Sequence, residues 1–119
     1  MANERVLYVC FDTSTLASRE RLFMSMGLNV STLLGMDGLL SARDVPTFDY
    51  ILLGEEASPL DQQHAIEWLQ GELSHVPTVI VLLRGNKPVA GADYQLTTDN
   101  SNVWADALAE YVREHRKLA

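Results

Sequence analysis

The chain has 119 residues, of which 47% are apolar, and this length suits one domain with a single hydrophobic core. Its net charge of −7 argues against nucleic acid or an anionic membrane surface as a direct partner, because both are bound through Lys and Arg. No apolar stretch approaches the ~20 residues that span a bilayer, and residues 1–9 lack the features of a secretory signal. Since Cys10 is the single cysteine, no intrachain disulfide can form, and we expect a protein of the reducing cytoplasm.

The first half of the chain alternates between apolar runs and helical segments. Residues 6–10 are continuously apolar, which is typical of a strand buried on both faces of a parallel sheet. Residues 14–26 carry apolar side chains amid charged ones and end at Gly27, a favourable helix C-cap. The more polar residues 28–34 resemble an edge strand, and residues 37–43 suit a short helix.

The second half continues this alternation with one interruption. Residues 50–53 and 78–83 are again continuously apolar, and the intervening Ser58-Pro59 marks a helix start with Ser as the N-cap. Residues 84–93 contain three Gly or Pro residues and no amphipathic stripe, so we expect a coil or a single turn where a crossover helix normally lies.

A short strand at residues 94–96 and a final helix complete the chain. From Val103 onwards, apolar residues line one stripe of this helix. Strands alternating with helices in this order predict an α/β protein with a doubly wound parallel sheet.

Several short motifs occur in a recognisable order. Residues 48–53 read FDYILL, residues 59–61 read PLD, residues 76–81 read VPTVIV, and residues 91–94 read GADY. With their spacing, they resemble the receiver domain of two-component response regulators, the CheY-like group of flavodoxin-like folds. The resemblance covers nearly the whole chain. It implies one receiver-like domain over residues 1–119, with five strands in the order 2-1-3-4-5 and the helix between strands four and five missing or reduced to a loop.

The residues that would carry a receiver's chemistry are replaced. The resemblance implies two adjacent acids after the first strand to hold Mg²⁺, but Cys10 and Phe11 stand there, and the phosphoacceptor aspartate is replaced by Gly54. Phosphoryl transfer needs a carboxylate, a divalent ion and an opposing cation, and glycine cannot accept a phosphoryl group. We therefore predict a degenerate pseudo-receiver that is not an enzyme and has no cofactor. Its degenerate phosphorylation pocket comprises Cys10, Phe11, Asp12, Gly54, Glu55, Leu83, Arg84 and Thr98.

Cys10 raises an alternative, because it follows a strand and opens a helix. This weakly resembles the cysteine loops of sugar phosphotransferase IIB proteins and of low-molecular-weight tyrosine phosphatases, which implies a phosphocarrier or phosphatase using the thiolate. The phosphatase pattern requires an arginine where this chain has Leu16. The simpler interpretation is a buried cysteine followed by the helix N-cap residues Asp12, Thr13 and Ser14.

Glu55 raises a second alternative, an atypical phosphoacceptor or a permanent mimic of a phosphorylated acid. The simpler interpretation is that Glu55 and Glu56 are solvated loop residues. Arg84 could pair with Asp12 or Glu55 and fill the old phosphate pocket.

Metal binding is not expected, because His64, His75 and His115 share no ligand spacing with one another or with Cys10. Loss of a helix beside strand five should uncover apolar surface, and Trp and Tyr are favoured in interfaces. We therefore expect a protein partner or a homodimer to use the face formed by Tyr94, Trp104, Leu108 and Tyr111, although Trp104 alternatively belongs to the core.

Overall fold

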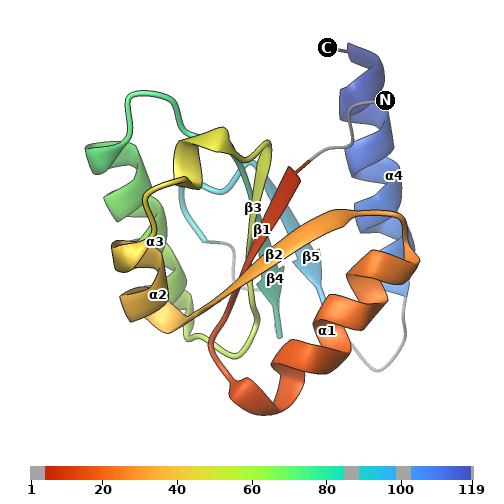
Figure 1. The fold of residues 1–119 in the computed structure, drawn as a ribbon, viewed down its shortest axis with the longest axis horizontal. Coiled ribbons are helices and arrows are strands. Elements are labelled where there is room, and N and C mark those ends of the chain that lie inside the picture. Colours follow the sequence, from red (N-terminus) through yellow and green to blue (C-terminus); the bar gives the residue numbers. More distant parts are fainter. Residues whose placement is uncertain (1–4, 85–88, 99–102, 119) are drawn as a thin grey trace.

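The computed structural model describes residues 5–84, 89–98 and 103–118, which form a sheet covered by helices (Figure 1). The five strands are parallel and lie in the order β2-β1-β3-β4-β5. This order confirms the flavodoxin-like, CheY-like prediction. In chain order the elements are β1 (Arg5–Cys10), α1 (Thr13–Ser25), β2 (Asn29–Leu34), α2 (Gly35–Ser41), the 3-10 helix η1 (Val45–Thr47), β3 (Tyr50–Leu53), α3 (Pro59–Glu72), β4 (Thr78–Leu83), β5 (Tyr94–Thr97) and α4 (Val103–Leu118).

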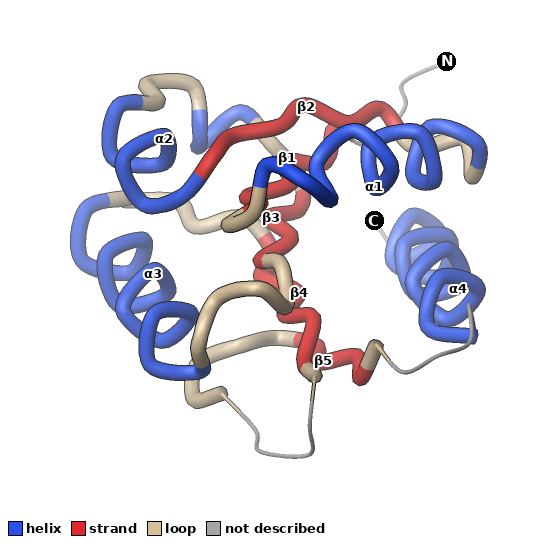
Figure 2. The backbone as a smooth tube through the Cα atoms, turned by 90° about the horizontal axis from the view of Figure 1, so that it is seen from below, coloured by secondary structure: helices blue, strands red, loops and turns tan. Residues whose placement is uncertain are grey.

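The helices cover the two faces of the sheet in pairs, with α1 and α4 on one side and α2 and α3 on the other (Figure 2). Alternate residues of each strand supply the two cores. On β1, Tyr8 packs in the α1/α4 core, whereas Leu7 and Val9 pack in the α2/α3 core. Because β1, β3 and β4 are buried on both faces, their sequences are continuously apolar, as predicted.

The ends of α1 and α3 follow the capping residues seen in the sequence. The Asp12 carboxylate accepts a hydrogen bond from Ser14 N at 2.9 Å, and the Ser58 hydroxyl accepts one from Asp61 N at 3.1 Å. Gly27, with a φ of +83°, turns the chain out of α1. Helix α2 begins two residues earlier than expected because Gly35, with a φ of +66°, turns the chain directly from β2 into it.

No helix occupies the described part of the connection from β4 to β5, as predicted; residues 85–88 lie outside the described residues. Residues 89–93 instead pack as a coil over the α2/α3 core. Val89 is buried in that core, and its N–H donates to Gln95 Oε1 at 2.9 Å. At Gly91, a Cβ would meet Ile66 Cγ2 at 2.8 Å, so the chain lies directly against α3. Among the described residues, no helix is long and apolar enough to cross a membrane.

Candidate functional site

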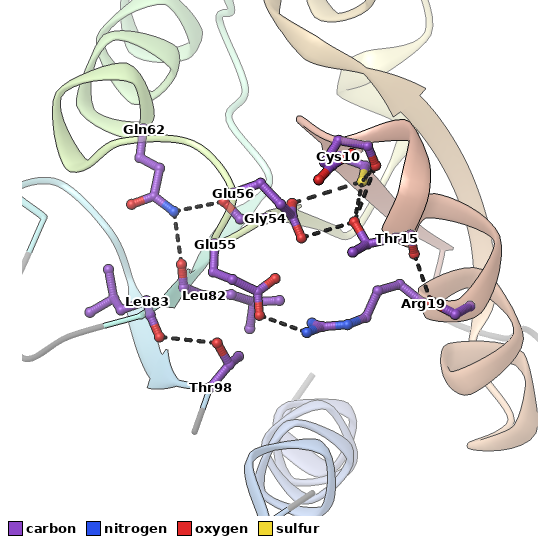
Figure 3. Close-up of polar contacts among 12 residues, drawn as sticks. Cys10, Thr15, Arg19, Gly54, Glu55, Glu56, Gln62, Leu82, Leu83 and Thr98 are labelled. Carbon is purple, nitrogen blue, oxygen red and sulfur yellow. Dashed lines mark hydrogen bonds and ion pairs between the residues drawn. The ribbon is translucent and has the colours of Figure 1, made fainter. Parts of the chain in front are cut away.

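The candidate site lies at the carboxyl edge of the sheet, where β1, β3 and β4 end (Figure 3). Strands of a parallel sheet all end at the same edge, and the residues that follow them therefore meet. In this chain, residues 11–12 after β1 lie beside the segment Gly54–Glu56 after β3. These residues bring together most of the degenerate pocket that the resemblance implied.

Gly54, at the expected phosphoacceptor position, has no room for a side chain. A Cβ on Gly54 would lie 2.6 Å from Glu56 Oε1, 3.2 Å from the Val9 carbonyl oxygen and 3.3 Å from the Tyr8 hydroxyl. The Gly54 N–H donates to the same Val9 carbonyl at 3.0 Å, which holds the backbone at this position. The Glu56 carboxyl group therefore fills the space into which a side chain at position 54 would project.

Glu56 is held in this position by residues from β1 and α1. Thr15 Oγ1 donates to Glu56 Oε2 at 3.0 Å, and the Cys10 thiol lies 3.8 Å from Glu56 Oε1. Burial raises the pKa of Glu56, and the adjacent Glu55 carboxylate raises it further, by more than the Thr15 hydrogen bond lowers it. Burial and the neighbouring carboxylate thus both act against ionisation of Glu56.

The Glu55 side chain extends toward α1, where it pairs with Arg19 (Figure 3). The Arg19 Nη2 to Glu55 Oε2 distance is 2.7 Å, and the two side chains are 20% and 6% exposed. The Arg19 guanidinium also stacks over the Trp104 ring at 4.5 Å, which connects α1 to α4. Burial raises the pKa of Glu55, but contacts with Thr98, Glu56 and Arg19 outweigh it, so its net pKa is lowered.

Two expectations about these charges are therefore wrong. Glu55 is not a solvated loop residue, because it is only 7% exposed and its carboxylate contacts Arg19 of α1. Its partner is Arg19 instead of Arg84, which is exposed at the end of β4. The Asp12 carboxylate is occupied as the α1 N-cap; hydrogen bonds from Ser14, aided by the charge of Arg84, lower its pKa.

Gln62 closes the site from the α3 side. It is 1% exposed, and its Nε2 donates to the Gly54 carbonyl at 2.9 Å and to the Leu82 carbonyl at 2.8 Å. At the neighbouring strand end, the Leu83 carbonyl accepts from Thr98 N at 2.7 Å and lies 3.2 Å from Thr98 Oγ1. Thr98 thus satisfies the backbone at the end of β4.

The sequence analysis missed Tyr8, Thr15, Arg19 and Gln62. A signal existed for three of them: Thr15 and Arg19 are four residues apart and share a helix face. Gln62 is a polar residue on the inward stripe of α3 that Ala65, Ile66 and Leu69 form. No sequence pattern marked Tyr8, which reads as an ordinary strand aromatic.

Cys10 and Phe11, two members of the predicted pocket, lie at the end of β1. The Cys10 side chain is fully buried, and its thiol donates to the Asp12 carbonyl at 3.0 Å. Phe11 is partly buried against the α2/α3 core. In the part of the chain that the structure describes, no three His, Cys, Asp or Glu side chains are grouped so as to hold a metal ion.

The expected interaction face is partly internal. Trp104 and Leu108 are 5% and 1% exposed and belong to the α1/α4 core, where the Trp104 ring packs edge-on against Phe23 at 6.1 Å. Trp104 is therefore a core residue. Tyr94 and Tyr111 are half-buried and stack at a centroid distance of 4.0 Å with an interplanar angle of 6°. These two residues are the members of the expected face that reach the surface.

Comparison with known proteins identifies the fold. The signal receiver domain of a putative Luxo repressor protein from Vibrio parahaemolyticus superposes with a TM-score of 0.75 and 14% identity, over 98% of this chain and 95% of that one. The receiver domain of a sensor histidine kinase from Pseudomonas aeruginosa, with a magnesium ion coordinated in its active site cleft, gives a TM-score of 0.66 and 19% identity, over 92% and 97%. A structure of a histidine kinase in complex with a response regulator gives 0.68 and 17%, over 93% and 97%.

Sequence comparison adds no closer relative, since no family model and no curated protein matches the chain. At these identities the structural likeness concerns the fold. The chain therefore has the fold of response regulator receiver domains, and its pocket contains glycine, cysteine and a glutamate pair where the resemblance implied an acid cluster.

Proposed function

We propose that this chain is a pseudo-receiver that works without phosphorylation, as a protein-interaction or dimerisation module in bacterial two-component signalling in the cytoplasm. The observation that carries the proposal is the occupation of the acceptor position: a Cβ at Gly54 would meet Glu56 Oε1 at 2.6 Å. The pocket is thus closed by the chain's own carboxyl group.

The charges of the pocket support the same conclusion. Acyl phosphate chemistry requires Mg²⁺ and a cation directed at the phosphoryl oxygens. The nearest guanidinium, that of Arg19, is committed to Glu55 at 2.7 Å and to the Trp104 ring at 4.5 Å. An incoming phosphoryl group would have to break this ion pair and enter beside a second carboxyl group, that of Glu56.

The proposal is tested by intact mass after incubation with acetyl phosphate and Mg²⁺. The wild-type chain, Cys10→Ser and Glu55→Gln are compared, with a receiver that has its acceptor aspartate as the positive control. We expect no added phosphate on the wild-type chain. A stoichiometric adduct would overturn the proposal, and the variant that abolished it would identify the acceptor as Cys10 or Glu55.

The surface of β5 and α4 is the proposed interaction face, now centred on Tyr94 and Tyr111. One of the compared structures is a complex of a histidine kinase with a response regulator, which supports a protein as the class of partner. The test is sedimentation of the purified chain over a range of concentrations, with and without Tyr94→Glu. We expect Tyr94→Glu to weaken self-association or partner capture, whereas Met24→Glu, which charges a 60% exposed side chain on α1, should not. Equal effects of the two variants would contradict the assignment of the face.

A further inference from the structure

The pocket contains two carboxyl groups and one guanidinium. Glu55 and Glu56 are consecutive, both are at least partly buried, and their carboxyl groups lie within hydrogen-bonding reach of each other when one of them is protonated. Arg19 pairs with Glu55 only. Ionisation of both glutamates would therefore leave one negative charge in the pocket without a partner in contact with it.

Among the residues that the structure describes, the groups around this pair offer no second cation. β1 contributes the Tyr8 hydroxyl and the Cys10 thiol, α1 contributes Thr15 and Arg19, the residue after β5 is Thr98, and α4 contributes the Trp104 ring. Of the outer charged residues, Arg84 is exposed and Asp12 is bound to Ser14 as a helix cap. Of the groups that lie beside the two glutamates, all except Arg19 are neutral or acidic.

A second observation points to a proton between the carboxyl groups. Glu55 Oε1 is buried and has no hydrogen-bond partner among the described residues: the nearby Thr98 hydroxyl donates to the Leu83 carbonyl, and Arg19 pairs with Glu55 Oε2. A buried carboxylate oxygen without a donor is costly. A proton carried by Glu56 supplies the missing donor and removes the excess charge in one step.

We propose that Glu55 and Glu56 share one proton and form a pH-operated latch, which holds the segment from Gly54 to Ser58 against the first turns of α1. In the closed state, the neutral Glu56 side chain donates to Glu55 and accepts from Thr15. Loss of the shared proton makes both groups anionic. Glu56 then turns toward solvent, its contact with Thr15 is lost, and the space beside Gly54 is uncovered.

The direction of the pH response follows from the environment of each glutamate. Burial and then the neighbouring carboxylate raise the pKa of Glu56, so the closed state persists above the pH at which exposed glutamates ionise and opens as pH rises through that raised pKa. Glu55 responds oppositely: burial acts against ionisation, but its polar contacts and Arg19 lower the pKa, so the Arg19 pair is lost only in stronger acid. The latch is closed between these two limits.

The test is an NMR titration of the side-chain carboxyl carbons together with the backbone amides of residues 54–58 and Thr15. The wild-type chain is compared with Glu56→Gln, which retains a donor but cannot ionise. The matched control is Glu72→Gln, an exposed glutamate at the end of α3. In wild type, Glu56 should titrate above the usual range of a glutamate, and the amides should follow the Glu56 transition. The protection factors of the amides in this segment, in which the intrinsic pH dependence of exchange is removed, should fall by roughly tenfold for each unit of pH above the Glu56 transition.

The amide transition should disappear in Glu56→Gln and persist in Glu72→Gln. Titration of Glu56 within the usual range of a glutamate, or an amide transition that survives in Glu56→Gln, would overturn the latch. The wild-type titration decides the matter alone if Glu56→Gln does not fold. Because neither a phosphoryl donor nor a partner is used, the outcome is independent of the proposed signalling function.

Discussion

Replacing Gly54 by alanine measures how firmly Glu56 closes the acceptor position. The φ angle of Gly54 is not positive, so the backbone tolerates alanine and the cost is steric. The new methyl group would meet Glu56 Oε1 at 2.6 Å, the Val9 carbonyl at 3.2 Å and the Tyr8 hydroxyl at 3.3 Å. Val9 is paired within the sheet and Tyr8 is fully buried, so Glu56 is the group that must move.

The expected cost is the sum of two effects. Overpacking against the sheet costs about 1–3 kcal/mol. Loss of the hydrogen bond between Thr15 and Glu56 costs about 1 kcal/mol. We therefore expect the free energy of unfolding, measured by urea denaturation, to fall by about 2–4 kcal/mol, and the melting temperature to fall by about 4 °C for each kcal/mol.

Two variants make this prediction specific. Gly71→Ala, in α3, places its Cβ where no atom lies within 4 Å, and it should stabilise the chain by about 0.5–1 kcal/mol through helix propensity. In the double variant Gly54→Ala/Glu56→Ala the clash with Oε1 is absent, so the two substitutions should be coupled by about 1–2 kcal/mol. A stability of Gly54→Ala within about 0.5 kcal/mol of wild type, or no coupling, would refute the reasoning.

Three further predictions concern the groups around the pocket. Gln62→Leu should cost about 2–4 kcal/mol in urea denaturation because it leaves two strand-end carbonyls without a donor, whereas Gln63→Leu should change stability by less than about 1 kcal/mol. Arg19→Ala should cost about 2–4 kcal/mol by leaving the buried Glu55 unpaired, and the exposed Arg21→Ala should be close to neutral; equal losses would contradict the ion pair. The pKa of Glu55 is lower in the folded state than in the unfolded chain, so its ionised form stabilises the fold above the unfolded pKa. This stabilisation is lost as pH falls through the folded-state pKa. Acid unfolding of Glu55→Gln should therefore depend less on pH than acid unfolding of the wild-type chain.

The sequence predicted the fold well because the relevant signals are local. Continuous apolar runs marked β1, β3 and β4, and the Ser58-Pro59 pair marked the start of α3. The absence of an amphipathic stripe after Leu83 predicted the coil that replaces a helix. Each of these signals depends on residues close together in the chain.

The site was predicted less completely because its contacts are long-range. Arg19 and Glu55 are 36 residues apart, and Thr15 and Glu56 are 41 apart. Two adjacent glutamates in a loop look solvated until α1 is placed over them. The core position of Trp104 likewise depends on a contact with Phe23 of α1, which is distant in the sequence. The sequence thus indicated which strand-end residues meet, but it could not show which side chains fill the space beside Gly54.

The close contact between Gly91 and α3 limits how this connection can change by insertion. Its φ of +90° and a Cβ that would meet Ile66 Cγ2 at 2.8 Å and Gln70 Nε2 at 3.2 Å mean that the chain has no spare room here. A full crossover helix grafted between β4 and β5 would have to displace this segment and remove Val89 from the core that it now completes. A helix in this connection therefore requires compensating changes on α3, because the space beside Gly91 is already filled by Ile66 and Gln70.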